Sequence, residues 1–187
     1  CFSAHPLKNL NAIGDSGFLV TNNKKLSERA KDLRNHGMTN RNKVNHFGHV
    51  SRMDNIQAAI LSFKLKTYDK VIKRRREVAK IYQDRLEHIH EIQLPAGPVN
   101  DGDNFDTYQN YELQAERRDE LQKFLKENGI GTLIQWGGLA IHQFTNLGFD
   151  QECPNTEIFF EKCIMLPMNV FVSDDDVHYV CDKVEEF

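Results

Sequence analysis

The sequence predicts an α/β protein whose first part is organised differently from its second. Three observations lead to this prediction. A Gly-rich turn precedes a β-prone apolar stretch at 18–21, and apolar residues recur at helical spacing between residues 53 and 81. Strand and helix patterns then alternate after the Pro- and Gly-containing run at 95–98. We therefore expect one domain over residues 1–90, with a loop, a hairpin and a long helix, and a small α+β domain over residues 91–187.

The first domain is expected to begin with a strand, a turn and a helix. Residues 18–21 are aromatic, β-branched or aliphatic, and two asparagines at 22–23 end the run. The amphipathic run 24–33 predicts a short helix, which His-Gly at 36–37 ends. The polar stretch 38–46 contains several asparagines, whose side chains compete with helical hydrogen bonding, and it predicts a loop.

A long helix, either straight or bent, is expected from Ser51 to about His88. Asp54 lies in its first turn, where a negative charge suits the helix dipole. Its apolar residues recur at spacings of three, four and seven, which is typical of a face packed on a core. They are Met53, Ile56, Ile60, Phe63, Val71, Val78 and Ile81. The basic run 73–76 within this helix is interpreted as a solvated face in preference to a phosphate contact.

The second domain is expected to alternate strands and helices. The pattern predicts a strand over 107–115, a helix over 119–128 stopped by Gly129, and a strand over 132–136. Two further helices are expected over 155–165 and 173–186. The last has the clearest start, because Ser173 supplies a capping hydroxyl and three aspartates follow it. We place the domain junction before the proline-containing run at 95–98 and the acidic run at 100–104.

The composition narrows the class of protein. The chain has 187 residues, of which 40% are hydrophobic and 27% charged, so it can bury a core. A formal net charge of −3 predicts no nucleic-acid partner. No apolar run approaches the roughly 18 residues of a membrane span and no leader is visible, so we expect a cytoplasmic chain without a membrane partner. The four cysteines lack the spacing of a zinc site and predict free, buried thiols and no metal.

Lys8 is the candidate with the most specific chemistry. Ser3 and His5 precede it, and the Gly-rich turn at 14–17 follows it, so the lysine is presented on a tight loop. A lysine held in this way beside a hydroxyl and an imidazole is placed for Schiff-base formation with a carbonyl cofactor. The alternative interpretation of the local sequence is a surface lysine in a polar loop.

Four motifs follow one another along the chain. They are Ser-x-His-Pro-x-Lys-Asn-Leu at 3–10, Gly-Asp-x-Gly-Phe at 14–18, Arg-Asn-His-Gly at 34–37 and Ser-Arg-Met-Asp-Asn-Ile-Gln-Ala-Ala-Ile at 51–60. Together they resemble the sugar aminotransferases of the DegT/DnrJ/EryC1/StrS family, whose members are longer. The chain resembles their C-terminal half, so we expect Cys1 to be a cut end. The resemblance implies the C-terminal part of the major domain of a PLP-dependent, fold-type-I transferase, followed by a small α+β domain.

The resemblance also implies roles for single residues. Lys8 matches the family's catalytic, cofactor-binding lysine, and Ser3 matches a hydroxyl donor to the cofactor phosphate, with a turn-capping hydroxyl as the alternative. His5 matches a histidine beside the cofactor and substrate, where it could contact a sugar hydroxyl, tune the lysine or be structural. His142 lines up with a histidine near the substrate cleft, or it is a packed helix histidine.

Two departures from the family pattern stand out. The family's partner subunit brings an asparagine to the cofactor phosphate at the position of Val50, so His49 or a residue of the Asn-rich loop is the expected substitute. Gln-Trp-Gly-Gly at 135–138 replaces a His-Tyr-Pro-like segment. Trp136, the only tryptophan, is placed either to stack on a sugar ring or nucleobase or to anchor the two domains. This form resembles enzymes that aminate carbon four of a dTDP-linked 6-deoxyhexose.

The resemblance therefore implies a PLP-dependent nucleotide-sugar aminotransferase. L-glutamate is the expected amino donor, a dTDP-4-keto-6-deoxyhexose the expected acceptor, and a homodimer the expected assembly. The isolated chain is expected to be nearly inactive, because the family's N-terminal half supplies other cofactor contacts. Its apolar residues at 18–20 and 53–63 are expected to be exposed. Two alternatives stay open: a non-catalytic structural or dimerising fragment, and an aminotransferase acting on a non-nucleotide cyclic ketone.

Overall fold

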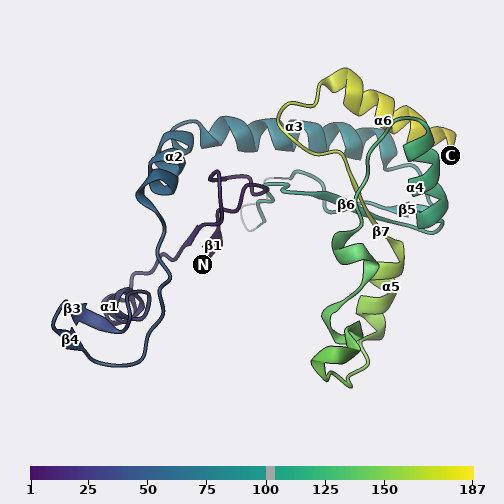
Figure 1. Cartoon of the computed structure of the whole chain (residues 1–187). Coiled ribbons are helices and arrows are strands. Elements are labelled where there is room, and N and C mark those ends of the chain that lie inside the picture. Colours follow the sequence, from purple (N-terminus) through teal and green to yellow (C-terminus); the bar gives the residue numbers. More distant parts are fainter. Residues whose placement is uncertain (100–103) are drawn as a thin grey trace. The chain divides into compact units, whose positions relative to one another are not determined.

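The computed structural model describes residues 1–99 and 104–187, so most of the acidic run expected after the domain junction lies outside the described residues. The described residues form two compact units, Cys1–Asp69 and Lys70–Phe187. This division falls earlier in the chain than the domain boundary expected after residue 90, which stays a prediction. Figure 1 labels the elements of each unit. No helix of the described residues has the length and apolarity needed to span a membrane.

The first unit consists of two small hairpin-like sheets and two helices. Strand β1 (Phe2–Ser3) pairs antiparallel with β2 (Gly17–Phe18), and β3 (Met38–Asn40) pairs antiparallel with β4 (Lys43–Val44). The helices are α1 (Lys24–Leu33) and α2 (Asn55–Leu65). The predicted strand at 18–21 is therefore reduced to its first residue, and the predicted loop at 38–46 contains the β3–β4 hairpin.

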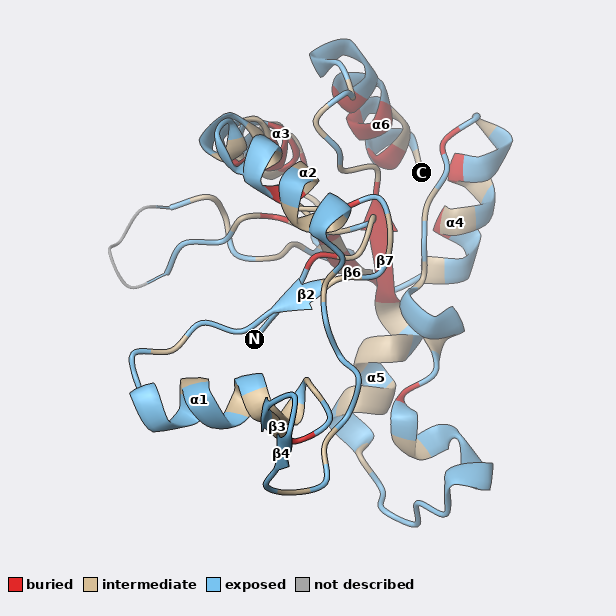
Figure 2. Ribbon diagram, turned by 60° about the vertical axis from the view of Figure 1, so that its left-hand side comes forward, coloured by how far each residue is buried: buried red, intermediate tan, exposed pale blue. Residues whose placement is uncertain are grey.

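Helix α1 has the predicted bounds. The Asn23 side chain caps it by accepting a hydrogen bond from the backbone N–H of Leu26, over 3.1 Å. The helix contains no buried residue, and in Figure 2 it carries only exposed and intermediate colours.

The single long helix expected from Ser51 is two helices, α2 and α3 (Tyr68–Leu86). At the break, the N–H groups of residues 66 and 67 bond to carbonyls only three residues back, at 3.3 and 3.1 Å, which tightens the last turn of α2. Of the predicted apolar face, Val78 is buried, whereas Ile56 and Phe63 are 63% and 74% exposed. The exposed apolar surface expected on this helix is thus confirmed.

The second unit is a three-stranded antiparallel sheet with helices. Its strands are β5 (Ile92–Gln93), β6 (Tyr111–Ala115) and β7 (Cys163–Leu166), in the order β5-β6-β7. Besides α3, its helices are α4 (Arg118–Glu127), α5 (Pro154–Lys162) and α6 (Asp174–Glu186). Three short 3₁₀ turns, η1 (Gln135–Gly138), η2 (Ile141–Gln143) and η3 (Thr145–Leu147), lie between α4 and α5.

The core of this unit lies between one face of the sheet and helices α3, α4 and α6. The buried residues in Figure 2 gather on these elements, and alternate residues of β6, at 111, 113 and 115, face the core. Tyr82 of α3 packs on Tyr111 with ring centroids 4.8 Å apart and donates its hydroxyl to the carbonyl of Pro167 at 2.8 Å. Burial raises the pKa of the Tyr82 hydroxyl.

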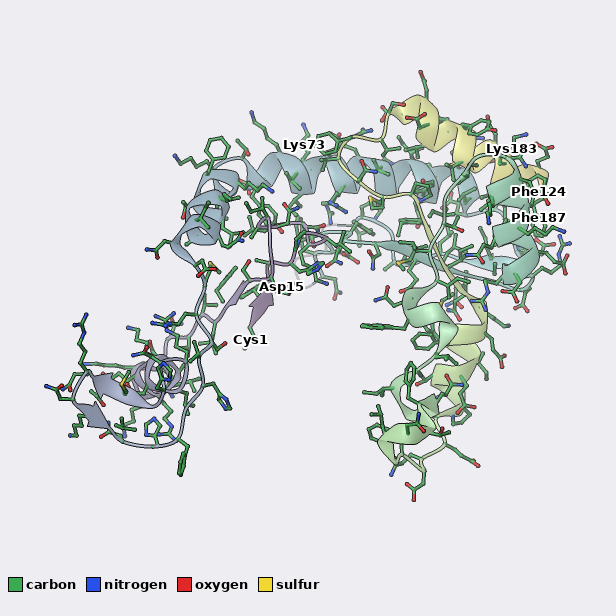
Figure 3. All side chains as sticks on the ribbon, viewed as in Figure 1. Cys1, Asp15, Lys73, Phe124, Lys183 and Phe187 are labelled. Carbon is green, nitrogen blue, oxygen red and sulfur yellow. The ribbon has the colours of Figure 1, made fainter. Side chains whose placement is uncertain are left out.

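The basic run of α3 is not a solvated face, which corrects the interpretation from the sequence. Arg75 is buried and donates to the carbonyls of Tyr108 and Gln109 at 2.9 and 3.0 Å. Arg76 likewise donates to backbone carbonyls, including that of Asp106 at 2.7 Å. Only Lys73, labelled in Figure 3, projects into solvent. The carbonyl groups of the irregular segment at 106–109 have no partners in a strand or helix. The two arginines donate hydrogen bonds to them and so hold this segment against α3.

The other predictions for this unit differ in how well they match the structure. The helix expected to reach residue 165 ends at Lys162, and the apolar residues after it form β7, which pairs with β6. The strand expected over 132–136 is a single bridge between Leu133 and Met165, followed by η1. The predicted start of α6 is confirmed, because Ser173 and Asp176 form a capping box.

The prediction of buried thiols is half right. All four cysteines are free, and Cys163 and Cys181 are buried, but Cys1 is exposed and Cys153 is only partly buried. Burial in the core raises the pKa of the Cys181 thiol to about 12.

Candidate functional site

The loop that carries Lys8 is closed by backbone hydrogen bonds. It leaves β1 after Ser3 and returns to β2 at Gly17. Inside it, the N–H of Ala12 bonds to the carbonyl of Ala4 at 2.9 Å, and the N–H of Ala4 bonds to the carbonyl of Ser16 at 2.8 Å. The N–H of Lys8 itself bonds to the carbonyl of His5 at 2.8 Å, which makes a tight turn. The lysine therefore has a fixed backbone.

Helix α2 braces this loop through side chains. Gln57 accepts a hydrogen bond from the N–H of Ile13 at 3.0 Å, and Lys64 donates to the side-chain oxygen of Asn11 at 2.8 Å. Asn11 also donates to the carbonyl of Pro6 at 2.6 Å. These contacts join α2 directly to the residues after Lys8 and, through Asn11, to Pro6 before it. Sequence analysis did not assign them a role, although the amide side chains after the lysine are a signal for such a loop.

One glycine of the turn, Gly17, is required by close approach to backbone, whereas Gly14 faces the end of a flexible side chain. A Cβ atom at Gly17 would lie 2.7 Å from the carbonyl oxygen of Phe2, and one at Gly14 would lie 2.7 Å from the side-chain nitrogen of Gln57. The first contact is with backbone that cannot move without breaking the β1–β2 pair. The Phe2 and Phe18 rings stack across this pair with centroids 5.0 Å apart.

The side chains of Lys8 and Ser3 are available for a ligand. Lys8 is partly buried, and within residues 1–99 and 104–187 its amine forms no hydrogen bond or ion pair. Ser3 is exposed, and its hydroxyl oxygen accepts a hydrogen bond from the N–H of His5 at 3.4 Å. The hydroxyl hydrogen of Ser3 is not used by that bond, so it can donate to an anionic group.

His5 is held at both ring nitrogens. Its Nδ1 accepts from the N–H of Leu7 at 3.2 Å, so a neutral ring carries its proton on Nε2. That nitrogen lies 3.6 Å from a carboxylate oxygen of Asp15, a residue labelled in Figure 3. Ser3, His5 and Lys8 thus lie together on one loop, as the motif predicted, and the imidazole is turned toward Asp15.

His49 lies on a different part of the first unit. Its backbone N–H bonds to the carbonyl of Leu33 at 2.7 Å, and its carbonyl accepts from the N–H of His36 at 2.9 Å. Val50 pairs with Asn35 in an isolated bridge and is exposed. The structure therefore fixes the backbone at 49–50 against the end of α1 and leaves the His49 side chain exposed. Its predicted phosphate contact stays a prediction.

Trp136 and His142 belong to the second unit. The Trp136 side chain is 75% exposed, and its backbone is left-handed with φ 50°, as are the two glycines that follow it. His142 lies in η2, and its Nε2 is 2.9 Å from Oε1 of Glu157 in α5. Accepting this hydrogen bond lowers the pKa of the Glu157 carboxyl. Sequence analysis missed Glu157, which is separated from His142 by several irregular turns.

The predicted site residues do not lie in the cavity of the second unit. A cavity of about 300 Å³ in the second unit is lined by residues that include Glu91, Arg117 and Phe187, and none of the predicted site residues lines it. Among the described residues, no cluster of histidine, cysteine and carboxylate side chains could hold a metal ion. The braced loop with an unpaired lysine amine and a donor hydroxyl is the arrangement that suits a cofactor with an aldehyde and a phosphate.

Comparisons with known proteins find relatives over the whole length of this chain. The chain is 34% identical over 190 residues to the "Pleiotropic regulatory protein" of Geobacillus stearothermophilus, covering 100% of this chain and 50% of that protein. It is 32% identical over 192 residues to the dTDP-3-amino-3,4,6-trideoxy-alpha-D-glucose transaminase of Streptomyces venezuelae, covering 100% and 49%. The chain spans about half the length of these curated relatives.

A solved structure gives the same result for the fold. S. venezuelae DesV, solved in complex with a ketimine intermediate, matches with a TM-score of 0.91 at 30% identity, covering 98% of this chain and 50% of DesV. The predicted fold class, part of a PLP-dependent transferase, is confirmed. The model of the DegT/DnrJ/EryC1/StrS aminotransferase family matches residues 1–185, nearly the whole chain. The chain therefore belongs to this family of PLP-dependent sugar aminotransferases.

Proposed function

We propose that the full-length protein is an aminotransferase that moves an amino group from L-glutamate to the ketone of a nucleotide-linked deoxysugar, with Lys8 as its catalytic residue. The observation that carries the proposal is the Lys8 amine, which has no partner among the described residues although its loop is braced on both sides. Such an amine is available for covalent attachment and for proton transfer.

The residues of the lysine loop suit the cofactor of the family. Bound PLP supplies the aldehyde and the electron sink that no protein side chain provides. The Nζ of Lys8 would attach to the cofactor, and once released it would take and return the proton at the reacting carbon. The hydroxyl of Ser3 would donate to the phosphate, and His5, oriented by Leu7 and Asp15, would lie beside the cofactor.

The remaining candidates are proposed for the phosphate and the acceptor. His49 of a partner subunit would contact the phosphate in the expected homodimer, since the family's asparagine is absent at Val50. Trp136 would offer its exposed ring to the sugar or base, and His142 would belong to the same acceptor region. The assignments of His49 and Trp136 rest on the motifs and on exposed side chains, and that of His142 rests on the motif alone.

The ring position of the ketone is the open part of the proposal. The Gln-Trp-Gly-Gly segment favours a dTDP-4-keto-6-deoxyhexose, whereas the S. venezuelae relative is named for an amino group at carbon three. Purified holoprotein charged with L-glutamate should be mixed separately with a 3-keto and a 4-keto dTDP-deoxysugar. Faster loss of the amino form of the cofactor with the 4-keto sugar supports the assignment from the Gln-Trp-Gly-Gly segment. Faster loss with the 3-keto sugar means that the acceptor is a 3-keto sugar instead.

The role of Lys8 is tested by substitution in the full-length protein. Lys8→Arg keeps the charge and removes the nucleophile, so turnover should fall at least about 100-fold, the scale of one catalytic acid–base group. Lys25→Arg is the matched control, because Lys25 is exposed at the start of α1 and should retain normal turnover. Normal transamination by the Lys8 variant would overturn the proposal and leave a structural role for this chain.

A further inference from the structure

The segment 133–143 is attached to the second unit at two places. At its start, Leu133 and Met165 exchange two backbone hydrogen bonds, at 2.8 and 3.2 Å, which join it to β7. Near its end, His142 bonds to Glu157 of α5 at 2.9 Å. The first link is a local extension of the sheet. The second depends on two side chains that are separated by 15 positions in the sequence.

Between these links the backbone adopts a conformation that side chains disfavour. Trp136 has φ 50°, and Gly137 and Gly138 have φ 68° and 80°. For a residue with a Cβ, the left-handed conformation costs about 1–2 kcal/mol, and it persists only where the surroundings enforce it. The Trp136 ring cannot provide that enforcement, because it is 75% exposed. The conformation is held by the turn itself, in which the N–H of Gly137 bonds to the carbonyl of Ile134 at 3.3 Å, and by the links on either side.

The His142–Glu157 link joins a buried imidazole to a carboxylate whose side chain is 39% exposed. The His142 side chain is only 10% exposed, so its ring nitrogen must be paired to offset the loss of water. Oε1 of Glu157 accepts both from His142 and, at 3.4 Å, from the N–H of Cys153 at the start of α5. The carboxylate is thereby fixed to its own helix while it holds the ring. Gln143 closes the neighbouring turn by accepting from the N–H of Ala140 at 2.8 Å.

We infer that Glu157 is a positioning residue for the acceptor: through His142 it holds the Trp136 segment in the conformation that receives the nucleotide sugar. This inference rests on the proposed function, in which Trp136 contacts the acceptor. His142 then does not contact the acceptor through Nε2, because that nitrogen is already bonded to Glu157. The amino donor does not need the Trp136 ring, so the two half-reactions should respond differently to loss of the anchor.

The test compares three variants of the full-length holoprotein. Glu157→Ala removes the acceptor oxygen, Glu157→Gln keeps an oxygen without the charge, and Glu161→Gln changes an exposed carboxylate of the same helix. Each half-reaction is measured separately by single-turnover absorbance. Trp136 mobility is measured by time-resolved fluorescence anisotropy, using the difference from the corresponding Trp136→Phe protein. Thermal unfolding confirms that each variant is folded.

We expect Glu157→Ala to raise the acceptor concentration for half-maximal rate about tenfold, the effect of losing roughly 1.4 kcal/mol. The donor half-reaction should stay within about twofold, and Trp136 should depolarise faster. Glu157→Gln should recover part of both effects, because its amide oxygen still accepts from His142. Glu161→Gln should match the wild type.

The inference is overturned if Glu157→Ala leaves the anisotropy unchanged, if both half-reactions fall equally, or if the segment loosens without any change in the acceptor half-reaction. Failure of the proposed function has a different signature, namely a wild-type holoprotein that no keto-sugar discharges. In that case the anisotropy still decides whether Glu157 holds the segment, because this measurement needs no turnover.

Discussion

Replacing Arg75 by alanine should destabilise the second unit strongly. Arg75 is 9% exposed, and one of its terminal nitrogens donates hydrogen bonds to the carbonyls of Tyr108 and Gln109 at 2.9 and 3.0 Å. Tyr108 has a left-handed backbone with φ 46° and is itself buried. The two hydrogen bonds thus hold a strained turn against α3, and truncation leaves two carbonyls without this donor.

The size of the effect follows from the two bonds. Each hydrogen bond from a charged donor contributes about 1.5–3 kcal/mol, and truncation also relieves the desolvation of the guanidinium. We therefore expect Arg75→Ala to lower the free energy of unfolding by about 3 kcal/mol. With an m-value of about 1–3 kcal/mol/M, the urea midpoint should fall by about 1 to 3 M.

Urea unfolding should be followed by near-UV circular dichroism of the buried tyrosines, since Tyr82 and Tyr111 pack in the same unit. Lys73→Ala is the matched control on α3. Its side chain is 80% exposed and forms a long ion pair with Glu77, so the change should stay below about 0.5 kcal/mol. Equal small losses for Arg75→Ala and Lys73→Ala would refute the role given to the buried arginine.

Three further predictions concern the described residues. Cys163 and Cys181 should react with a thiol reagent only on unfolding, because both are buried and burial raises the pKa of each thiol; rapid labelling of either in the native protein would contradict this. Gly37→Ala should lower the melting temperature, since its φ is 72° and a Cβ would meet backbone at 1.7 Å, whereas Gly131→Ala, with open space around it, should change it little. Glu112→Gln should be more stable than the wild type at pH 7, because burial raises the pKa of this carboxyl and its ionisation opposes folding. The difference should shrink as the pH falls toward the ordinary value of 4.5, and a difference that grows on acidification would contradict the reasoning.

Elements with local signals could be predicted from the sequence. Helix α1 has its cap, Asn23, and its stop within the same short stretch, and α6 begins at Ser173 followed by acidic residues. Their bounds therefore follow from nearby residues. Strand β7 could not be found in this way, because an apolar run directly after a helix has the same pattern as more helix. Its strand conformation depends on pairing with β6, which is distant in the sequence.

The candidate site also contains residues that a local motif groups together and residues that only the folded structure brings together. Ser3, His5 and Lys8 come from one continuous motif, so the sequence could group them on one loop. Glu157 could not be connected to His142, because nothing in an acidic residue of a first helical turn specifies its partner across irregular backbone. The buried role of Arg75 was missed for the same reason, since its acceptor carbonyls belong to a turn 33 and 34 positions away.

The central claim is that one particular lysine carries the cofactor, and trapping it is the most direct measurement. The full-length protein is incubated with PLP, reduced with borohydride, digested and analysed by peptide mass spectrometry. We expect a pyridoxyl group on the peptide containing Lys8 and none in the Lys8→Arg variant. A pyridoxyl group on another lysine with Lys8 unmodified, or no adduct at all, would contradict it.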